Sequence, residues 1–223
     1  MLNFDFSQAM RVLAVSAIPA LLGIILHEVA HGWAAKRCGD PTASMLGRLS
    51  LNPISHIDPM GLAVFGLTSL TGSFVFGWAK PVPVDPRYFR HPERDMMLVS
   101  LAGPGTNCIL AVFFGILLYI LAFWLPYGEL KDNVFYRFGL ATSQAGVVIN
   151  FGLAWLNLMP IPPLDGSKIL AYFLPQQWAW RFMDWGRYGF IILLVLLFTG
   201  LLGSILGPLV RYSSLFLLSL LGF

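Results

Sequence analysis

The sequence predicts an all-α polytopic membrane protein that forms a single membrane domain over residues 1–223. Its 223 residues are 57% hydrophobic and only 11% charged, whereas ordinary soluble domains carry about 25% charged residues. Several uncharged runs also exceed the roughly 20 residues that a helix needs to cross a bilayer. The net charge of +3 is small and spread along the chain, which argues against a nucleic-acid partner and is typical of loop charges that orient a protein in the lipid bilayer.

About four to six transmembrane helices are expected. The first covers residues 12–26 and continues through residue 35. It starts like a cleaved signal peptide, but its apolar character continues past the small residues of "AVSAIPA", so we predict that it is retained. The other long apolar runs are 96–128, 138–164 and 188–210, the last of which is expected to span over 188–206. The tail 207–223 either lies in the membrane interface or makes a short extra span.

Lysine and arginine gather on three loops, which predicts that these loops face the cytoplasm. The basic loops are 36–48, 78–95 and 165–187, whereas the loop 126–137 balances its basic residues with acidic ones. The N-terminus is then external, and the first helix runs inward. The apolar stretch 59–77 joins two of the basic loops and is rich in glycine. We therefore interpret it as a membrane-embedded hairpin that returns to the side it came from.

Two histidines and a glutamate interrupt the first apolar run, in the stretch "GIILHEVAHG" at residues 23–32. His27 and His31 share one face of a helix, about 6 Å apart along its axis. This spacing lets two imidazoles bind one metal ion, and Glu28 is placed to activate a water beside it. The alternative is a set of core side chains satisfied by neighbouring helices, but ionisable residues at membrane depth are rare and usually functional. The pattern therefore predicts a Zn²⁺ site, with one ion per chain.

A zinc hydrolase usually has three protein ligands, so a third ligand should come from another helix at similar depth. Asp165 is the strongest candidate, because it ends an uncharged run and follows three prolines that unwind the helix end. Its alternative role is to cap the amphipathic stretch that follows. His56 and Asp58, in "SHIDPMG", compete as ligands. They lie in a polar loop without helical spacing, so we predict that they support the site or its loop.

Three motifs together resemble the site-2 protease family of intramembrane zinc metalloproteases. They are "HEVAH" in the first span, "AGPGTN" in the second and "NLMPIPPLDG" at the end of the third. With "LNPISHIDPMG" and "FGWAKPVPV" added, the chain is most similar to the small bacterial members that lack a PDZ domain. The likeness covers residues 23–168, which implies a catalytic core over 12–168 followed by C-terminal helices over 169–223.

The resemblance also implies a role for each candidate residue. It makes His27, His31 and Asp165 the zinc ligands and Glu28 the general base, and it places Asn107 near the oxyanion. The alternative for Asn107 is a hydrogen bond between helices, which is common for asparagine in membrane bundles. A short β-like edge between the first two core helices would pair with unwound substrate. That segment consists of Lys80, Pro81, Val82, Pro83 and Val84.

The expected function is hydrolysis of peptide bonds in or near transmembrane segments of membrane proteins, at the cytoplasmic side of the bacterial plasma (inner) membrane. A metal-ion transporter is an alternative, but it would need a relay of polar groups across the whole bilayer. A non-catalytic relative that binds transmembrane helices is a further alternative, against which the intact Glu28 argues. The sequence leaves the physiological substrate and the oligomeric state open.

Overall fold

The computed structural model describes residues 6–61, 63–64, 66, 80–125 and 127–223. Four helices in it are long and apolar enough to cross a membrane: Met10–Arg37, Pro92–Trp124, Val134–Leu158 and Leu201–Leu220. No strand occurs among the described residues. The protein is therefore an all-α polytopic membrane protein, and the predicted fold class is confirmed.

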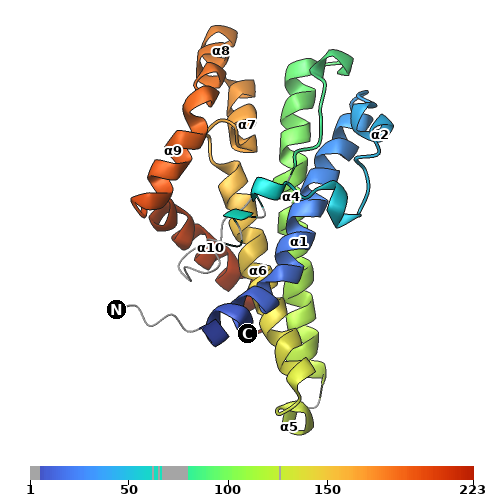
Figure 1. The fold of residues 1–223 in the computed structure, drawn as a ribbon, viewed down its shortest axis with the longest axis vertical. Coiled ribbons are helices and arrows are strands. Elements are labelled where there is room, and N and C mark those ends of the chain that lie inside the picture. The colour runs from blue at the N-terminus through green and yellow to red at the C-terminus, as the bar shows by residue number, and fades with distance from the viewer. Residues whose placement is uncertain (1–5, 62, 65, 67–79, 126) are drawn as a thin grey trace.

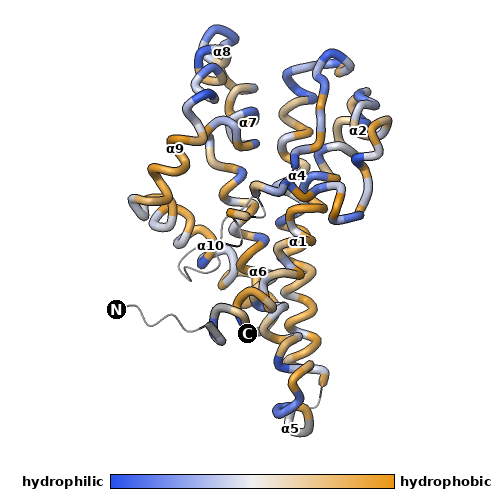
Figure 2. Tube along the Cα trace, in the orientation of Figure 1, coloured by the Kyte–Doolittle hydropathy of each residue, from blue (hydrophilic) through white to orange (hydrophobic). Residues whose placement is uncertain are grey.

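Three long helices form the centre of the molecule (Figure 1). They are α1 (Phe6–Arg37), α4 (Pro92–Tyr119) and α6 (Val134–Leu158), and each contacts the other two. A π-helical turn, η3 (Ile120–Trp124), continues α4. Hydrophobic residues cover most of the length of all three helices (Figure 2), as expected where one side meets lipid and the other meets protein.

Small residues allow these helices to approach closely, as is usual in membrane bundles. The ring of Phe114 in α4 lies against Gly146 in α6, where a Cβ atom would come within 2.2 Å of the ring. Phe114 also belongs to a buried apolar cluster with Val147 and Leu217. By contrast, the side chain of Ile109 in α4 is 70% exposed. An outward surface of this kind is typical of a helix that contacts lipid.

Loops and short helices gather at one end of the bundle. α2 (Thr42–Met45), α7 (Asp165–Phe173) and α8 (Gln176–Asp184) lie at this end, and α5 (Tyr127–Leu130) lies at the other (Figure 1). Two short 3₁₀ helices, η1 (Pro53–Ser55) and η2 (Pro86–Tyr88), belong to the loops between α2 and α4. The loops rich in lysine and arginine therefore share one end of the molecule, which is the arrangement expected for loops on the same side of a membrane.

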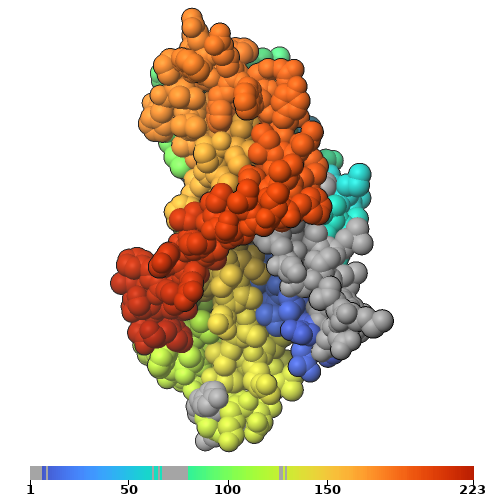
Figure 3. Space-filling model, turned by 90° about the vertical axis from the view of Figure 1, so that its left-hand side faces the viewer, coloured from blue at the N-terminus to red at the C-terminus, as the bar shows by residue number. Residues whose placement is uncertain are grey.

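The last apolar run is divided differently from the prediction. A span over 188–206 is wrong, because α9 (Gly186–Phe198) ends and α10 (Leu201–Leu220) begins within it. Gly200, between them, has φ of 76°, a left-handed conformation that glycine adopts freely and that commonly ends helices. α10 is the fourth candidate span and contains most of the tail 207–223, whereas α9 is shorter. Figure 3 shows the two helices passing across one face of the bundle.

The predicted hairpin over 59–77 lies largely outside the described residues, so it stays a prediction. Residues 59–61, 63–64 and 66 are helical. Asp58 caps their start, because its Oδ1 accepts the N–H groups of Met60 and Gly61. The edge-like segment 80–84 is described and is neither helix nor strand.

Candidate metal centre

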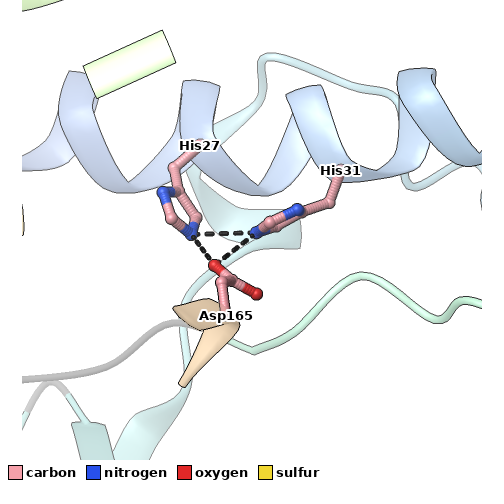
Figure 4. Close-up of side chains that lie close together, drawn as sticks. All are labelled: His27, His31 and Asp165. Carbon is pink, nitrogen blue, oxygen red and sulfur yellow. Dashed lines mark hydrogen bonds and ion pairs between the residues drawn. The ribbon is translucent and has the colours of Figure 1, made fainter. Parts of the chain in front are cut away.

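Two histidines on α1 and an aspartate at the start of α7 bring three ligand atoms together (Figure 4). Nε2 of His27 lies 2.9 Å from Nε2 of His31. Oδ2 of Asp165 lies 3.2 Å from the first of these nitrogens and 3.1 Å from the second. Tetrahedral zinc with ligands at about 2.1 Å separates its ligand atoms by about 3.4 Å. Since the observed separations are only slightly shorter, the three buried residues fit a zinc ion with little adjustment.

A proline-rich turn brings Asp165 to α1. α6 ends at Leu158, and the turn that follows contains Pro160, Pro162 and Pro163, none of which can continue a helix interior. Gly166 permits the close return of the chain, because a Cβ atom there would lie 2.1 Å from the carbonyl oxygen of Leu158. The prolines thus end α6, and the glycine lets α7 start directly beside that end.

The Asp165 carboxylate points at the histidines instead of capping α7. No side chain caps the start of this helix, and Oδ1 of Asp165 lies 3.4 Å from Nζ of Lys168. Its Oδ2 instead faces Nε2 of both histidines, at 3.2 and 3.1 Å. The carboxylate is therefore placed to bind a cation together with the two imidazoles.

The outer nitrogens of the two imidazoles have acceptor partners. Nδ1 of His27 lies 2.7 Å from Oδ1 of Asn107, and Nδ1 of His31 lies 2.7 Å from the carbonyl oxygen of Val99. Since neither oxygen can donate, each Nδ1 carries the proton and each Nε2 keeps a free lone pair. Both rings are therefore in the tautomer that binds a metal through Nε2.

Gly103 of α4 leaves the space that the two rings occupy. A Cβ atom at this position would lie 2.5 Å from Nε2 of His31 and 2.6 Å from Cε1 of His27. The rings contact each other edge to face, with centroids 4.5 Å apart. A side chain on Gly103 would therefore displace the ligand atoms themselves.

Glu28 lies beside the three ligands in a cavity of about 370 Å³. Its Oε2 accepts the backbone N–H of Val82 at 2.7 Å. Pro81, Val82 and Val84 line the same cavity, whereas Lys80 and Pro83 are not among its lining residues. The structure thus joins the predicted general base directly to the predicted edge segment.

Known proteins of similar sequence are named as putative zinc metalloproteases, which agrees with the set of ligand atoms described above. The chain is 36% identical over 197 residues to putative zinc metalloprotease YwhC of Bacillus subtilis, a match that covers 87% of this chain and 84% of the relative. It is 34% identical over 182 residues to putative zinc metalloprotease Rip2 of Mycolicibacterium smegmatis, covering 80% and 64% of the two chains. It is 30% identical over 170 residues to putative zinc metalloprotease MJ0611 of Methanocaldococcus jannaschii, covering 75% and 74%.

The chain belongs to the family of these putative zinc metalloproteases. The protein spans about two thirds of the length of the mycobacterial relative and more of the other two. No protein-family model matches it, and no solved structure matches it significantly.

In this member of the family, Asn107 lies directly behind His27. Its Nδ2 donates to the carbonyl oxygen of Gly23 at 3.1 Å and to Oδ1 of Asn150 at 3.2 Å. Asn107 is fully buried and is not among the residues that line the cavity. The oxyanion role implied by the resemblance requires amide N–H groups that face the cavity, and here both are bonded elsewhere. The alternative, a hydrogen bond between helices, describes the observed contacts.

His56 and Asp58 hold loop backbone and lie outside the group of three ligand atoms. Nε2 of His56 lies 2.7 Å from the carbonyl oxygen of Ser50. The backbone carbonyl of His56 accepts the N–H of Lys80 at 2.9 Å. Asp58 caps the helical residues after it. His56 thereby fixes one end of the segment that lines the cavity.

Sequence reasoning missed three groups that contact the site: Gly103, the carbonyl of Val99, and Asn150. Asn150 carries a detectable signal, since an amide within an apolar span is a candidate for a role in a membrane bundle. Gly103 lies within the quoted "AGPGTN" motif, but nothing in the sequence gives it a role, and the Val99 carbonyl has no sequence signal. Both gain their role from the way α4 packs on α1.

Proposed function

We propose that the protein is an intramembrane zinc endopeptidase of the site-2 protease type, with one zinc ion per chain. Its substrates are membrane proteins, cut in or near their transmembrane segments. One observation carries this proposal: Nε2 of His27 and His31, the Asp165 carboxylate and Glu28 face one cavity between helices apolar enough to span a membrane. Two imidazoles and one carboxylate form a usual ligand set for catalytic zinc.

Glu28 is the general base in this proposal. His27, His31 and Asp165 would hold the zinc ion, which would supply Lewis acidity and so allow attack by water near neutral pH. Oε2 of Glu28 accepts the Val82 N–H, so Oε1 takes the proton of the attacking water. Glu28 then passes this proton to the leaving amine. Meanwhile the bonds from Nδ1 of His27 and His31 hold the two rings in place.

The segment 80–84 offers few backbone groups to a substrate strand. Prolines at 81 and 83 have no N–H, and the N–H groups of Lys80 and Val82 are already bonded. Arg48 donates to the carbonyls of Lys80 and Pro81. Within the described part of the chain, the N–H of Val84 and the carbonyls of residues 82–84 remain available. We therefore place substrate pairing at the Val84 end of the segment.

The active site lies toward the cytoplasmic side of the bacterial plasma membrane in this proposal. The basic loops share the end of the bundle at which α1 ends and α7 begins (Figure 1), and basic loops are retained in the cytoplasm. His27 precedes Lys36, at the end of α1, by nine residues, which places it about 13 Å along the helix from that end. The scissile bond would then lie in the cytoplasmic leaflet.

The test is Glu28→Gln in purified protein, with bound zinc and cleavage of a model transmembrane peptide both measured. We expect zinc content to stay near that of the unaltered protein and cleavage to fall by about 10²- to 10⁴-fold, the usual contribution of a general base. Glu93→Gln, which changes an exposed carboxylate in the first turn of α4, should leave both unchanged. Undiminished cleavage by the Glu28→Gln protein would contradict the proposal. Zinc uptake into liposomes at the same rate with and without this substitution would favour a transporter.

A further inference from the structure

We propose that Asn150 of α6 is a positioning residue for the metal centre, which acts through Asn107 to keep His27 in the tautomer that binds zinc. The proposal rests on the proposed zinc site and concerns a residue that lines no part of its cavity. Asn150 and Asn107 are both fully buried, at the place where α1, α4 and α6 meet.

The Asn107 amide has nearly the same shape when it is turned by 180°, so only its hydrogen-bond partners fix its direction. Its Oδ1 accepts from Nδ1 of His27 at 2.7 Å. An amide turned by 180° would present N–H to Nδ1 instead, and that nitrogen would then need its lone pair for the hydrogen bond. The proton of His27 would move to Nε2, the atom that faces Asp165. The direction of the Asn107 amide therefore decides whether His27 can bind a metal.

Two acceptors fix this direction. The Nδ2 group of Asn107 donates one hydrogen to the carbonyl oxygen of Gly23 at 3.1 Å and the other to Oδ1 of Asn150 at 3.2 Å. A reversed Asn107 would place its oxygen against two other oxygens, and the side-chain oxygens of Asn107 and Asn150 would both be buried without a donor. Polar groups left unsatisfied in a membrane are strongly disfavoured. The Gly23 carbonyl accepts only one of the two Nδ2 hydrogens. Asn150 therefore supplies one of the two contacts that fix the direction of the Asn107 amide.

Asn150 has a fixed direction of its own. Its Nδ2 donates to the carbonyl oxygen of Gly146 at 2.9 Å, one turn earlier in α6. A backbone carbonyl can only accept, so Oδ1 of Asn150 must face Asn107. Each hydrogen bond in this chain therefore has a fixed donor and acceptor: His27 donates to Asn107, Asn107 to Asn150, and Asn150 to the backbone of α6.

Gly23 makes room for the pair of amides. A Cβ atom at Gly23 would lie 2.7 Å from Oδ1 of Asn150 and 3.4 Å from Nδ2 of Asn107. The alternative is a purely structural role, in which the two asparagines only join helices, as amides often do in membrane bundles. A bond that merely joins helices changes the stability of the bundle, whereas a positioning role changes zinc affinity through Asn107.

The test measures zinc affinity, by competition with a chelator, for Asn107→Leu, Asn150→Leu and the double variant in detergent. We expect Asn150→Leu to weaken zinc binding by about 10- to 100-fold, as substitutions behind a metal ligand usually do. The double variant should bind zinc no more weakly than Asn107→Leu, because Asn150 acts only through Asn107. The visible spectrum of the Co²⁺-loaded Asn150→Leu protein should also change, which reports the ligand geometry without any assay of activity.

The control is Thr142→Val, which removes another buried polar group of α6, a hydroxyl that has no hydrogen-bond partner and lies eight positions before Asn150. It should keep the zinc affinity and Co²⁺ spectrum of the unaltered protein. Asn150→Ala, which adds no volume, gives the same comparison if the leucine does not fit. Unchanged zinc affinity in Asn150→Leu, or losses that simply add in the double variant, would overturn this proposal alone. An unaltered protein that binds no zinc would overturn the proposed function as well.

Discussion

Among single residues, the absence of a side chain at Gly103 matters as much to the site as the ligands do. A Cβ atom there would lie 2.5 Å from the ligand nitrogen of His31 and 2.6 Å from the ring of His27. Real Cβ atoms essentially never approach other atoms closer than 3.0 Å. An added methyl group must therefore move the rings or push α4 away from α1.

We expect Gly103→Ala to weaken zinc binding and to lower the rate of peptide cleavage by about 100-fold. The physical reason is that a shift of about 1 Å in a catalytic group has an effect of this size. Zinc content after dialysis against a chelator and cleavage of a transmembrane peptide are the two measurements.

Gly105→Ala is the matched control, since it makes the same change two positions further along α4, where no atom beyond the adjacent helix backbone lies within 4 Å of the added Cβ. It should retain both zinc and activity. A Gly103→Ala protein that behaves like its Gly105→Ala counterpart would show that the rings do not need this space.

Among the helices, α9 contacts the turn that carries Asp165. A Cβ atom at Gly189 would lie 1.5 Å from the carbonyl oxygen of Pro162 and 3.1 Å from Cδ of Pro163. Asp165 follows this turn by two residues. α9 therefore supports the turn that leads to the third ligand.

Gly189→Ala is expected to lower the free energy of unfolding by about 1–3 kcal/mol, the usual cost of overpacking. It should also weaken zinc binding, because the turn must move. Thermal unfolding and chelator competition measure the two effects. Gly203→Ala in α10 adds its methyl group to open space and should leave zinc binding unchanged. Equal zinc affinity in the two variants would refute a supporting role for α9.

The helices and the ligands differ in how far the sequence could predict them. Hydropathy predicted three spans close to their observed positions, and the spacing of His27 and His31 predicted a shared helix face. Hydropathy missed the break at Gly200, because a glycine inside an apolar run leaves the average unchanged. The partners of the two rings were harder to predict. The resemblance placed Asn107 at the site but near the oxyanion, whereas it contacts His27. Nothing indicated the Val99 carbonyl, because its contact with His31 arises only from the packing of α4 on α1.

In the molecule as a whole, residues far apart in the sequence meet at one end of an apolar bundle. The charged residues of α4 lie in its first turn, and α4 has none after Asp95; α6 has none after Arg137. A relay of charged groups across the bilayer, which an ion pathway would need, is therefore missing from both helices. The arrangement suits a reaction in one leaflet better than transport.

Zinc K-edge X-ray absorption on the purified protein in detergent tests most directly whether His27, His31 and Asp165 bind a single ion. We predict one zinc per chain, with only nitrogen and oxygen neighbours at about 2.0–2.2 Å and the outer-ring scattering of two imidazoles. A protein without stoichiometric zinc, or one whose zinc has sulfur neighbours at about 2.3 Å, would contradict this account.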